Sequence, residues 1–226
     1  MPIHWSPYTH RTDSPGVDWS RFPDLSVPLG YPAGVELLQQ NADIQAVHVI
    51  HEGVIKLDHL SGDGRSAIIG LRTAGSILGG AEALHDHASP TSAVTTIRTT
   101  VSTIPARKFR ALFASDPTFC ACVGNALGRD AHLDTLMAIE RASYDARTRL
   151  MRFLTDLNGQ APERQPAVTS VRLPLTQAEI AQLLGFTPQH LSYLLAQLER
   201  QGLLTRKAGL IMWRPHASRP RNAASA

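Results

Sequence analysis

The sequence has few of the residues that build disulfide frameworks, metal cages or membrane spans. Its only cysteines, Cys120 and Cys122, are too few and too close together for a disulfide scaffold or a tetrahedral metal site. It contains no run of about 18 apolar residues that could cross a bilayer. The first ten residues lack the basic and apolar segments of a signal peptide. We therefore expect a cytoplasmic protein without a membrane partner.

Charge is small in total but unevenly distributed. The 226 residues carry a formal net charge of +3. Dividing the chain after Ser143 gives 11 Lys and Arg against 14 Asp and Glu before the division (−3), and 11 against 5 after it (+6). A basic C-terminal part beside a mildly acidic N-terminal part indicates a phosphate-binding module joined to one with a different role.

Residues 173–213 contain two helix starts in close succession. Thr176 and Glu179 form a T-x-x-E capping box, in which each side chain can bond the other residue's backbone N–H. Apolar residues then recur at helical spacing up to Gly185, which favours a left-handed helix end. Thr187 and Pro188 are typical of the N-cap and first position of a second helix. The pattern predicts two helices joined by a tight turn.

The second helix has one apolar and one polar face. We expect Leu191, Leu194, Leu195 and Leu198 to face inward, and Gln189, His190, Ser192, Tyr193, Gln197 and Arg200 to face outward, until Gly202 ends the helix. Residues 203–213 then predict two short strands about Ala208-Gly209, with Arg206 and Lys207 near the tip. A helical hairpin buried in a core is the alternative interpretation, and the basic wing argues against it.

This block resembles the winged helix-turn-helix of the Crp/Fnr (catabolite-activator-like) transcription regulators. The resemblance implies that the second helix enters the DNA major groove. It gives DNA contacts to Thr176, Gln177, Thr187, Pro188, Gln189, His190, Ser192, Tyr193, Arg206 and Lys207. Family members commonly carry a Glu and an Arg where this chain has Gln189 and Tyr193, with Pro188 in place of a further Arg. Because a Gln amide pairs with adenine, we expect an operator unlike the family's G-T-G-A half-site.

Residues 27–104 read as short β-strands with regular turns, which is typical of an all-β barrel or sandwich. The expected strands are 35–40, 44–60, 66–72 and 93–104. A P-x-G turn at Pro32, a hairpin over 48–56 and a G-x-x-L-G turn at Gly75 resemble the double-stranded β-helix, or jelly roll, of the Crp/Fnr sensor domain. The implied fold is α+β. Its parts are an arm at 1–26, a sensor barrel at 27–117, a dimerisation helix at 118–143 and a winged helix-turn-helix domain at 144–226.

The segment that would bind an effector departs from the family's pattern. The resemblance places the pocket at Gly80, Ala81, Glu82, Thr91 and Ser92. Ala81 stands where cyclic-nucleotide-binding members have a ribose-binding Glu, and Glu82 is shifted toward the opposite face. Thr91 stands where they have the phosphate-binding Arg. Since a buried phosphate depends on a charged donor, we expect no ordinary cAMP binding, and the effector stays unknown.

The histidines and cysteines give only weak support for a metal, haem or iron–sulfur cofactor. His85 and His87, with His51 and His59 on neighbouring strands, could hold a metal or one axial position of haem, but a solvated loop is the plainer interpretation. The family's iron–sulfur sensors use an N-terminal cysteine cluster, and no cysteine precedes Cys120. We therefore expect no iron–sulfur cluster and no haem or metal. Cys120 and Cys122 point to different helix faces, where a redox switch is a further alternative.

From Pro105 the pattern becomes helical. Residues 105–117 resemble the family's short helix after the barrel, and 119–143 its long dimer helix. Apolar spacing is partial at Val123, Leu127, Leu133, Leu136, Met137 and Tyr144, and it is interrupted by Asp130, Asp134 and Arg141. We expect a core-packed helix with one edge in a two-fold dimer seam, a hinge at 142–146, a helix at 146–157 and a strand at 171–173.

The expected function is a homodimeric, sequence-specific regulator that binds double-stranded DNA and contacts RNA polymerase, and not an enzyme. Two alternatives stay open. A metal-dependent enzyme of the cupin type has only the His-x-His pair in its favour. An effector-independent regulator would use the barrel as a scaffold. The sequence names neither the effector, nor the operator, nor the sign of regulation.

Overall fold

The computed structural model describes residues 19–22, 25, 27–158, 169–171, 175–207 and 210–213. The chain forms two compact units, Met1–Tyr144 and Asp145–Ala226. Most of the expected arm at 1–26, including Trp5 and Tyr8, lies outside the described residues, as does the segment 159–168. No helix in the described ranges is long and apolar enough to cross a membrane.

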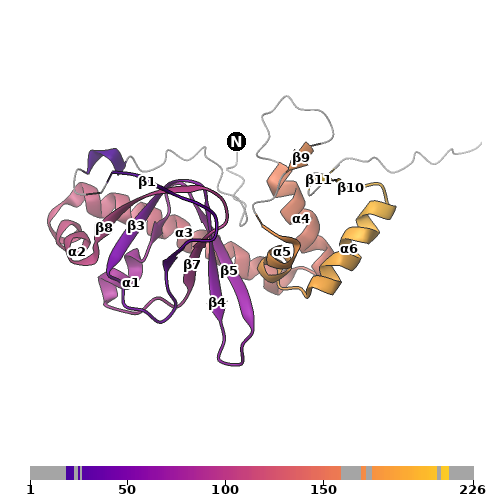
Figure 1. Ribbon diagram of the computed structural model, residues 1–226, viewed down its shortest axis with the longest axis horizontal. Helices are drawn as coiled ribbons and strands as arrows, with labels where there is room; N and C mark the ends of the chain where they lie inside the picture. Colours follow the sequence, from indigo (N-terminus) through magenta and orange to yellow (C-terminus); the bar gives the residue numbers. More distant parts are fainter. Residues whose placement is uncertain are drawn as a thin grey trace, which may run out of the picture. The chain divides into compact units, whose positions relative to one another are not determined.

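The first unit is built on two four-stranded antiparallel sheets (Figure 1). One has the order β1 (Leu29–Tyr31), β8 (Thr99–Pro105), β3 (Ala46–Glu52), β6 (Ile77–Leu78); the other has β2 (Glu36–Leu38), β7 (Ser92–Thr95), β4 (Val54–Leu60), β5 (Ser66–Thr73). Neighbours in each sheet are mostly far apart in sequence. This arrangement confirms the jelly-roll expectation.

The chain passes between the sheets where single strands were expected. The predicted strand at 93–104 is two strands, because β7 pairs with β4 in one sheet and β8 pairs with β3 in the other. The run at 44–60 turns at Gly53, whose φ of 105° favours glycine. A Cβ there would collide with Thr99. Two short strands, β1 and β6, have no counterpart in the sequence prediction.

Three helices complete the first unit: α1 (Gly80–His85), α2 (Ala106–Ser115) and α3 (Pro117–Ser143). Trp19 and Phe22, at and just after the 3-10 turn η1 (Trp19–Arg21), pack on Phe119 of α3, with ring centroids 6.3 and 5.0 Å apart. All three rings are buried. The end of the arm therefore belongs to the core of this unit.

The long helix begins two residues earlier than predicted. The Asp116 carboxylate accepts hydrogen bonds from the Thr118 and Phe119 backbone N–H groups, at 2.8 and 3.0 Å, and Pro117 occupies the first helical position. Asp-Pro is a helix-start signal that the prediction assigned to the preceding helix. In Figure 1 the helix runs behind the strands, and it packs on β5 and β6.

The second unit is a winged helix-turn-helix. Its elements are α4 (Ala146–Asn158), β9 (Thr169–Val171), α5 (Gln177–Leu184), α6 (Pro188–Arg200), β10 (Leu204–Lys207) and β11 (Leu210–Trp213). The strands form one antiparallel sheet in the order β10-β11-β9. The expected wing hairpin is confirmed, and its tip at 208–209 lies outside the described residues. The short strand predicted at 171–173 is described only up to Val171.

Candidate functional site

The helix-turn-helix is held by the caps that the sequence predicts. The Thr176 hydroxyl accepts a hydrogen bond from the Glu179 backbone N–H at 3.2 Å, and the Glu179 carboxylate accepts one from the Thr176 backbone N–H at 2.7 Å. Gly185 ends α5 with φ 71°, where its N–H reaches back to the Ala181 and Gln182 carbonyls. The Thr187 hydroxyl then caps α6 by accepting from the His190 N–H. These local bonds fix the tight turn between the helices.

Helix α6 separates its two faces as predicted. Its four inward leucines, Leu191, Leu194, Leu195 and Leu198, are at most 5% exposed. Gln189, His190, Ser192 and Tyr193 are exposed on the opposite side, and Tyr193 retains 55% of its accessible surface. An apolar face this well buried leaves the polar face free to meet a partner.

Aromatic contacts order that polar face. The His190 ring stacks on Tyr193, with centroids 6.5 Å apart, and meets Phe186 edge-on at 5.7 Å. Gln197 donates a hydrogen bond to the Tyr193 hydroxyl at 2.9 Å. On the other side, the Arg149 guanidinium of α4 lies 4.8 Å from the Phe186 ring centre. These contacts restrict the rotamers of His190 and Tyr193 before any ligand binds.

The remaining residues of the predicted interface lie beside α6. Thr176 and Gln177 are exposed at the start of α5, and Thr187 and Pro188 are exposed at the start of α6. Arg206 and Lys207 lie on β10, opposite Ile211 and Leu210 of β11. The side chains of this last pair are outside the described part of the chain.

A cavity of about 310 Å³ lies in the first unit between the two sheets and α3, and we call it the sheet–helix cavity. Its apolar lining comes from Leu38, Leu57, Ile77, Leu78 and Leu127, and its polar lining from Arg72, Glu82, Ser89, Thr91, Asp130 and Asp134. A mainly apolar hollow with a few convergent polar groups is typical of a small-molecule site.

Three of the five predicted effector residues line this cavity. They are Ala81, Glu82 and Thr91. Glu82 lines it although its shift by one position predicted the opposite face. Gly80 is buried, and a Cβ on it would meet Ile77 at 2.8 Å. The Ser92 hydroxyl accepts a hydrogen bond from the Gln40 N–H instead.

Sequence reasoning missed the arginine inside the cavity. Arg72 of β5 is 8% exposed, and its guanidinium donates to both oxygens of Asp134 at 3.0 and 2.6 Å. Its Nε lies 3.6 Å from Asp130 Oδ2. The available signal was an arginine in an otherwise apolar strand, since a buried guanidinium needs acidic partners.

Asp130 is the most deeply placed acid of this group. It is 5% exposed, and its Oδ1 accepts a hydrogen bond from the Ser76 hydroxyl at 2.9 Å. Burial raises the pKa of Asp130 above its ordinary value, and the charge of Arg72 and the Ser76 bond oppose that rise. Asp130 Oδ2 accepts no hydrogen bond from any residue that the structure describes.

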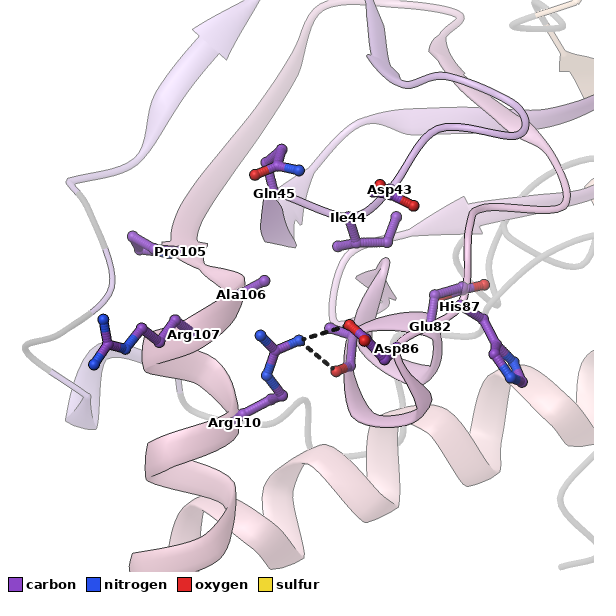
Figure 2. A pocket seen from close by; sticks show the side chains of 11 residues that line it. Asp43, Ile44, Gln45, Glu82, Asp86, His87, Pro105, Ala106, Arg107 and Arg110 are labelled. Carbon is purple, nitrogen blue, oxygen red and sulfur yellow. Dashed lines mark hydrogen bonds and ion pairs between the residues drawn. The ribbon is translucent and has the colours of Figure 1, made fainter.

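A second hollow, the α1–α2 cavity, measures about 360 Å³ and is lined by both short helices and the segment before β3. Figure 2 shows Arg110 directed at Asp86, 3.6 Å away, while Arg107 of the same helix points elsewhere. Arg110 also donates a hydrogen bond to the Ala83 carbonyl at 3.1 Å. Arg110 and Asp86 are both largely exposed. This cavity is an open surface feature without a buried polar group.

The histidines named as metal candidates have other partners. His51 shares a hydrogen bond of 2.8 Å with the Ser102 hydroxyl, and burial lowers the pKa of its ring. His59 Nδ1 lies 3.0 Å from the Pro90 carbonyl. The rings of His85 and His87 are 6.0 Å apart. Within the described residues, no three His, Cys, Asp or Glu side chains are grouped so as to hold a metal ion.

Comparison with known proteins agrees with both units. Residues 148–216 match the model of the Crp-like helix-turn-helix domain, and residues 28–116 match that of the cyclic nucleotide-binding domain. The chain belongs to the Crp/Fnr family of transcription regulators. Its helix-turn-helix is therefore a DNA-binding domain. Most of the residues that line the sheet–helix cavity lie in the segment that matches the cyclic nucleotide-binding domain, and the rest lie on α3.

The relatives of this Crp/Fnr protein are distant in sequence. The cAMP-activated global transcriptional regulator CRP of Haemophilus influenzae is 24% identical over 77% of this chain and 78% of its own. The fumarate and nitrate reduction regulatory protein of Vibrio cholerae is 24% identical over 81% and 73%. The c-di-GMP responsive global regulator CLP of Xanthomonas campestris shares the fold, with a TM-score of 0.71 at 20% identity over 83% of this chain and 93% of that one.

Proposed function

We propose that this Crp/Fnr regulator binds operator DNA as a two-fold dimer and reads it with the exposed face of α6. The observation that carries the proposal is the pre-ordered pair His190 and Tyr193, next to the exposed Gln189, above a buried leucine face. Ser192 and the capping residues Thr176, Gln177, Thr187 and Pro188 border it. Arg206 and Lys207 of the wing contribute charge for phosphates.

The exposed face of α3 supports a dimer seam. Small residues follow one another there at intervals of three and four: Ala121, Gly124, Gly128, Ala131, Thr135 and Ala138. A Cβ at Gly124 or Gly128 would have no atom of its own chain within 4 Å. Each glycine inside a helix costs about 1 kcal/mol relative to alanine. Two glycines are consistent with the close approach of a second helix.

The seam can be tested by sedimentation. Gly128→Glu adds a bulky charge to the stripe, and we expect it to convert a dimer into a monomer in analytical ultracentrifugation. The matched control is Ala114→Glu on the exposed side of α2, which should sediment like the wild type. A wild-type protein that sediments as a monomer, both alone and with its operator, contradicts the dimer.

The DNA partner can be identified by selection from a random duplex library. We expect a pseudo-palindrome with half-sites about 10 to 10.5 base pairs apart, because each subunit presents one recognition helix on the same side of the duplex. RNA polymerase is the partner that a regulator bound beside a promoter would contact. Recovery of no motif, or of a single unrepeated half-site, contradicts the proposed mode.

We also propose that the sheet–helix cavity is a sensor site that does not take cAMP in the family's usual way. Thr91 and Ala81 line the cavity, and neither supplies a charged partner for a phosphate or a carboxylate for a ribose hydroxyl. Calorimetry with cAMP should give no saturable heat at low micromolar concentration. The contrary result is saturable binding that is lost on Thr91→Val.

A further inference from the structure

The sheet–helix cavity has an acidic wall that its single lining arginine does not neutralise. The lining contains three carboxyl groups: those of Asp130 and Asp134, which contact Arg72, and that of Glu82. The Nε of a second arginine, Arg129, lies 3.9 Å from Asp130 Oδ1. If every group is charged, the site keeps an excess of negative charge even with Arg129 included. An entering cation would therefore be attracted and an entering anion repelled.

Arg72 has little capacity left for an anionic ligand. Its Nη1 donates to the Leu71 carbonyl and to Asp134 Oδ1, and its Nη2 donates to Asp134 Oδ2. An anion on Nη1 would have to displace Asp134, and an anion on Nε would lie beside Asp130, whose Oδ2 is 3.6 Å away. The cavity also lacks the second positive side chain that such an exchange would require in its lining.

Asp130, in contrast, has an unused acceptor. Its side chain is buried, it lines the cavity, and its Oδ2 accepts no hydrogen bond from the described residues. The Nε of Arg72, 3.6 Å away, is too distant for one. A buried carboxylate oxygen without a donor is costly, and a ligand N–H would remove that cost.

We propose that the sheet–helix cavity binds a small organic cation, a protonated amine or amidine attached to an apolar body. Asp134 and Asp130 take the cationic group, and Leu38, Leu57 and Leu127 enclose the body. This inference rests on the proposed sensor function of the cavity. Because the cation competes with Arg72 for Asp134, binding weakens the connection between β5 and α3.

Three probes of nearly equal shape test the charge preference in the full-length protein: benzamidine, benzamide and benzoate. Titration calorimetry, supported by ligand-observed NMR, should show benzamidine binding at least about tenfold more tightly than benzoate, as expected for a charge-assisted contact. Benzamide should lie between them. Benzoate binding as tightly as benzamidine, or saturation by none of the three, overturns the proposal.

Matched variants locate the bound probe. Asp134→Asn removes a half-exposed carboxylate without changing its shape, and it should weaken benzamidine by about tenfold. The control is Asp86→Asn, which removes an exposed carboxylate from the α1–α2 cavity and should leave the affinity unchanged. The opposite pattern places the probe in the α1–α2 cavity and overturns the proposal.

Arg72→Met tests whether removing the positive charge from the cavity strengthens the binding of a cation. Without the arginine, Asp134 and Asp130 are free for the probe, so benzamidine should bind more tightly if the variant folds. DNA binding is measured on the same samples without any probe. Loss of the benzamidine preference with intact operator binding ends the cation inference alone, whereas absence of operator binding by the wild-type protein ends the proposed function.

Discussion

In α6 the buried side chains are leucines, whereas the buried stripe of α3 contains two acids. The α3 stripe is Phe119, Val123, Ala126, Asp130, Leu133, Met137 and Glu140, spaced at three and four. The outer face of α6 is polar, and the outer face of α3 includes a stripe of small residues. Helix α6 therefore packs by apolar burial alone, and α3 combines apolar packing with ion pairs to its own barrel.

The comparison shows why α3 was misjudged from its sequence. Asp130, Asp134 and Arg141 were treated as interruptions of an apolar pattern. Asp130 and Asp134 instead meet Arg72, and Arg141 donates to the Ile68 carbonyl at 2.9 Å. These charges are contacts with strand β5, so a period computed from apolar residues alone misses the helix face that they occupy.

The largest expected effect comes from breaking the ion pairs of α3. Arg72→Met should lower the free energy of unfolding by roughly 3 to 5 kcal/mol, because the buried Asp130 loses its nearer arginine and keeps only Arg129, 3.9 Å from its Oδ1. Urea denaturation followed by circular dichroism measures the change. The double variant Arg72→Met/Asp130→Asn should recover part of the loss. No recovery would mean that packing of the arginine stem, and not its charge, sets the cost.

A smaller effect is expected on the exposed face of α6. Gln189→Ala should cost about 1 to 3 kcal/mol in operator binding and relax the preference at one base pair, since a Gln amide pairs with adenine. Arg206→Ala is the control, which should weaken all sequences alike and lower the salt slope by about one. Selection from a random duplex library with the wild type and both variants shows whether Gln189 reads a base. If wild type and Gln189→Ala recover the same motif, Gln189 takes no part in readout.

Local signals predicted the second unit better than the first. The capping box at Thr176, the left-handed Gly185 and the Thr187-Pro188 start are short-range features, and all three are confirmed. Strands β1 and β6 depend on partners 72 and 30 residues away, as in the pairs Leu29–Val101 and His48–Leu78. The Arg72–Asp134 pair spans 62 residues. A single sequence gives no register for such contacts, so the polar lining of the sheet–helix cavity was not predicted.

The smallest expected effect is a pH dependence confined to Asp130. Burial raises the pKa of Asp130 in the folded state, whereas in the unfolded chain an Asp titrates near about 3.9. Between these two values the folded protein binds the proton and the unfolded chain does not. The contribution of Asp130 to the free energy of unfolding should therefore increase as the pH falls through this window, and it is complete below the unfolded value.

Asp130→Asn removes this titration and keeps the side chain's shape. Unfolding free energies of wild type and variant, measured by urea titration from about pH 3.5, just below the unfolded value, to about pH 7, give the difference curve. As the pH falls, we expect the free energy of unfolding of the wild type to rise relative to that of Asp130→Asn. The exposed control Asp86→Asn should show no such pH-dependent difference from the wild type. A gain with rising pH would mean that the attraction of Arg72 outweighs desolvation. Asp130 would then be a paired carboxylate in the same sense as Asp134, and α3 would hold its barrel by two full ion pairs.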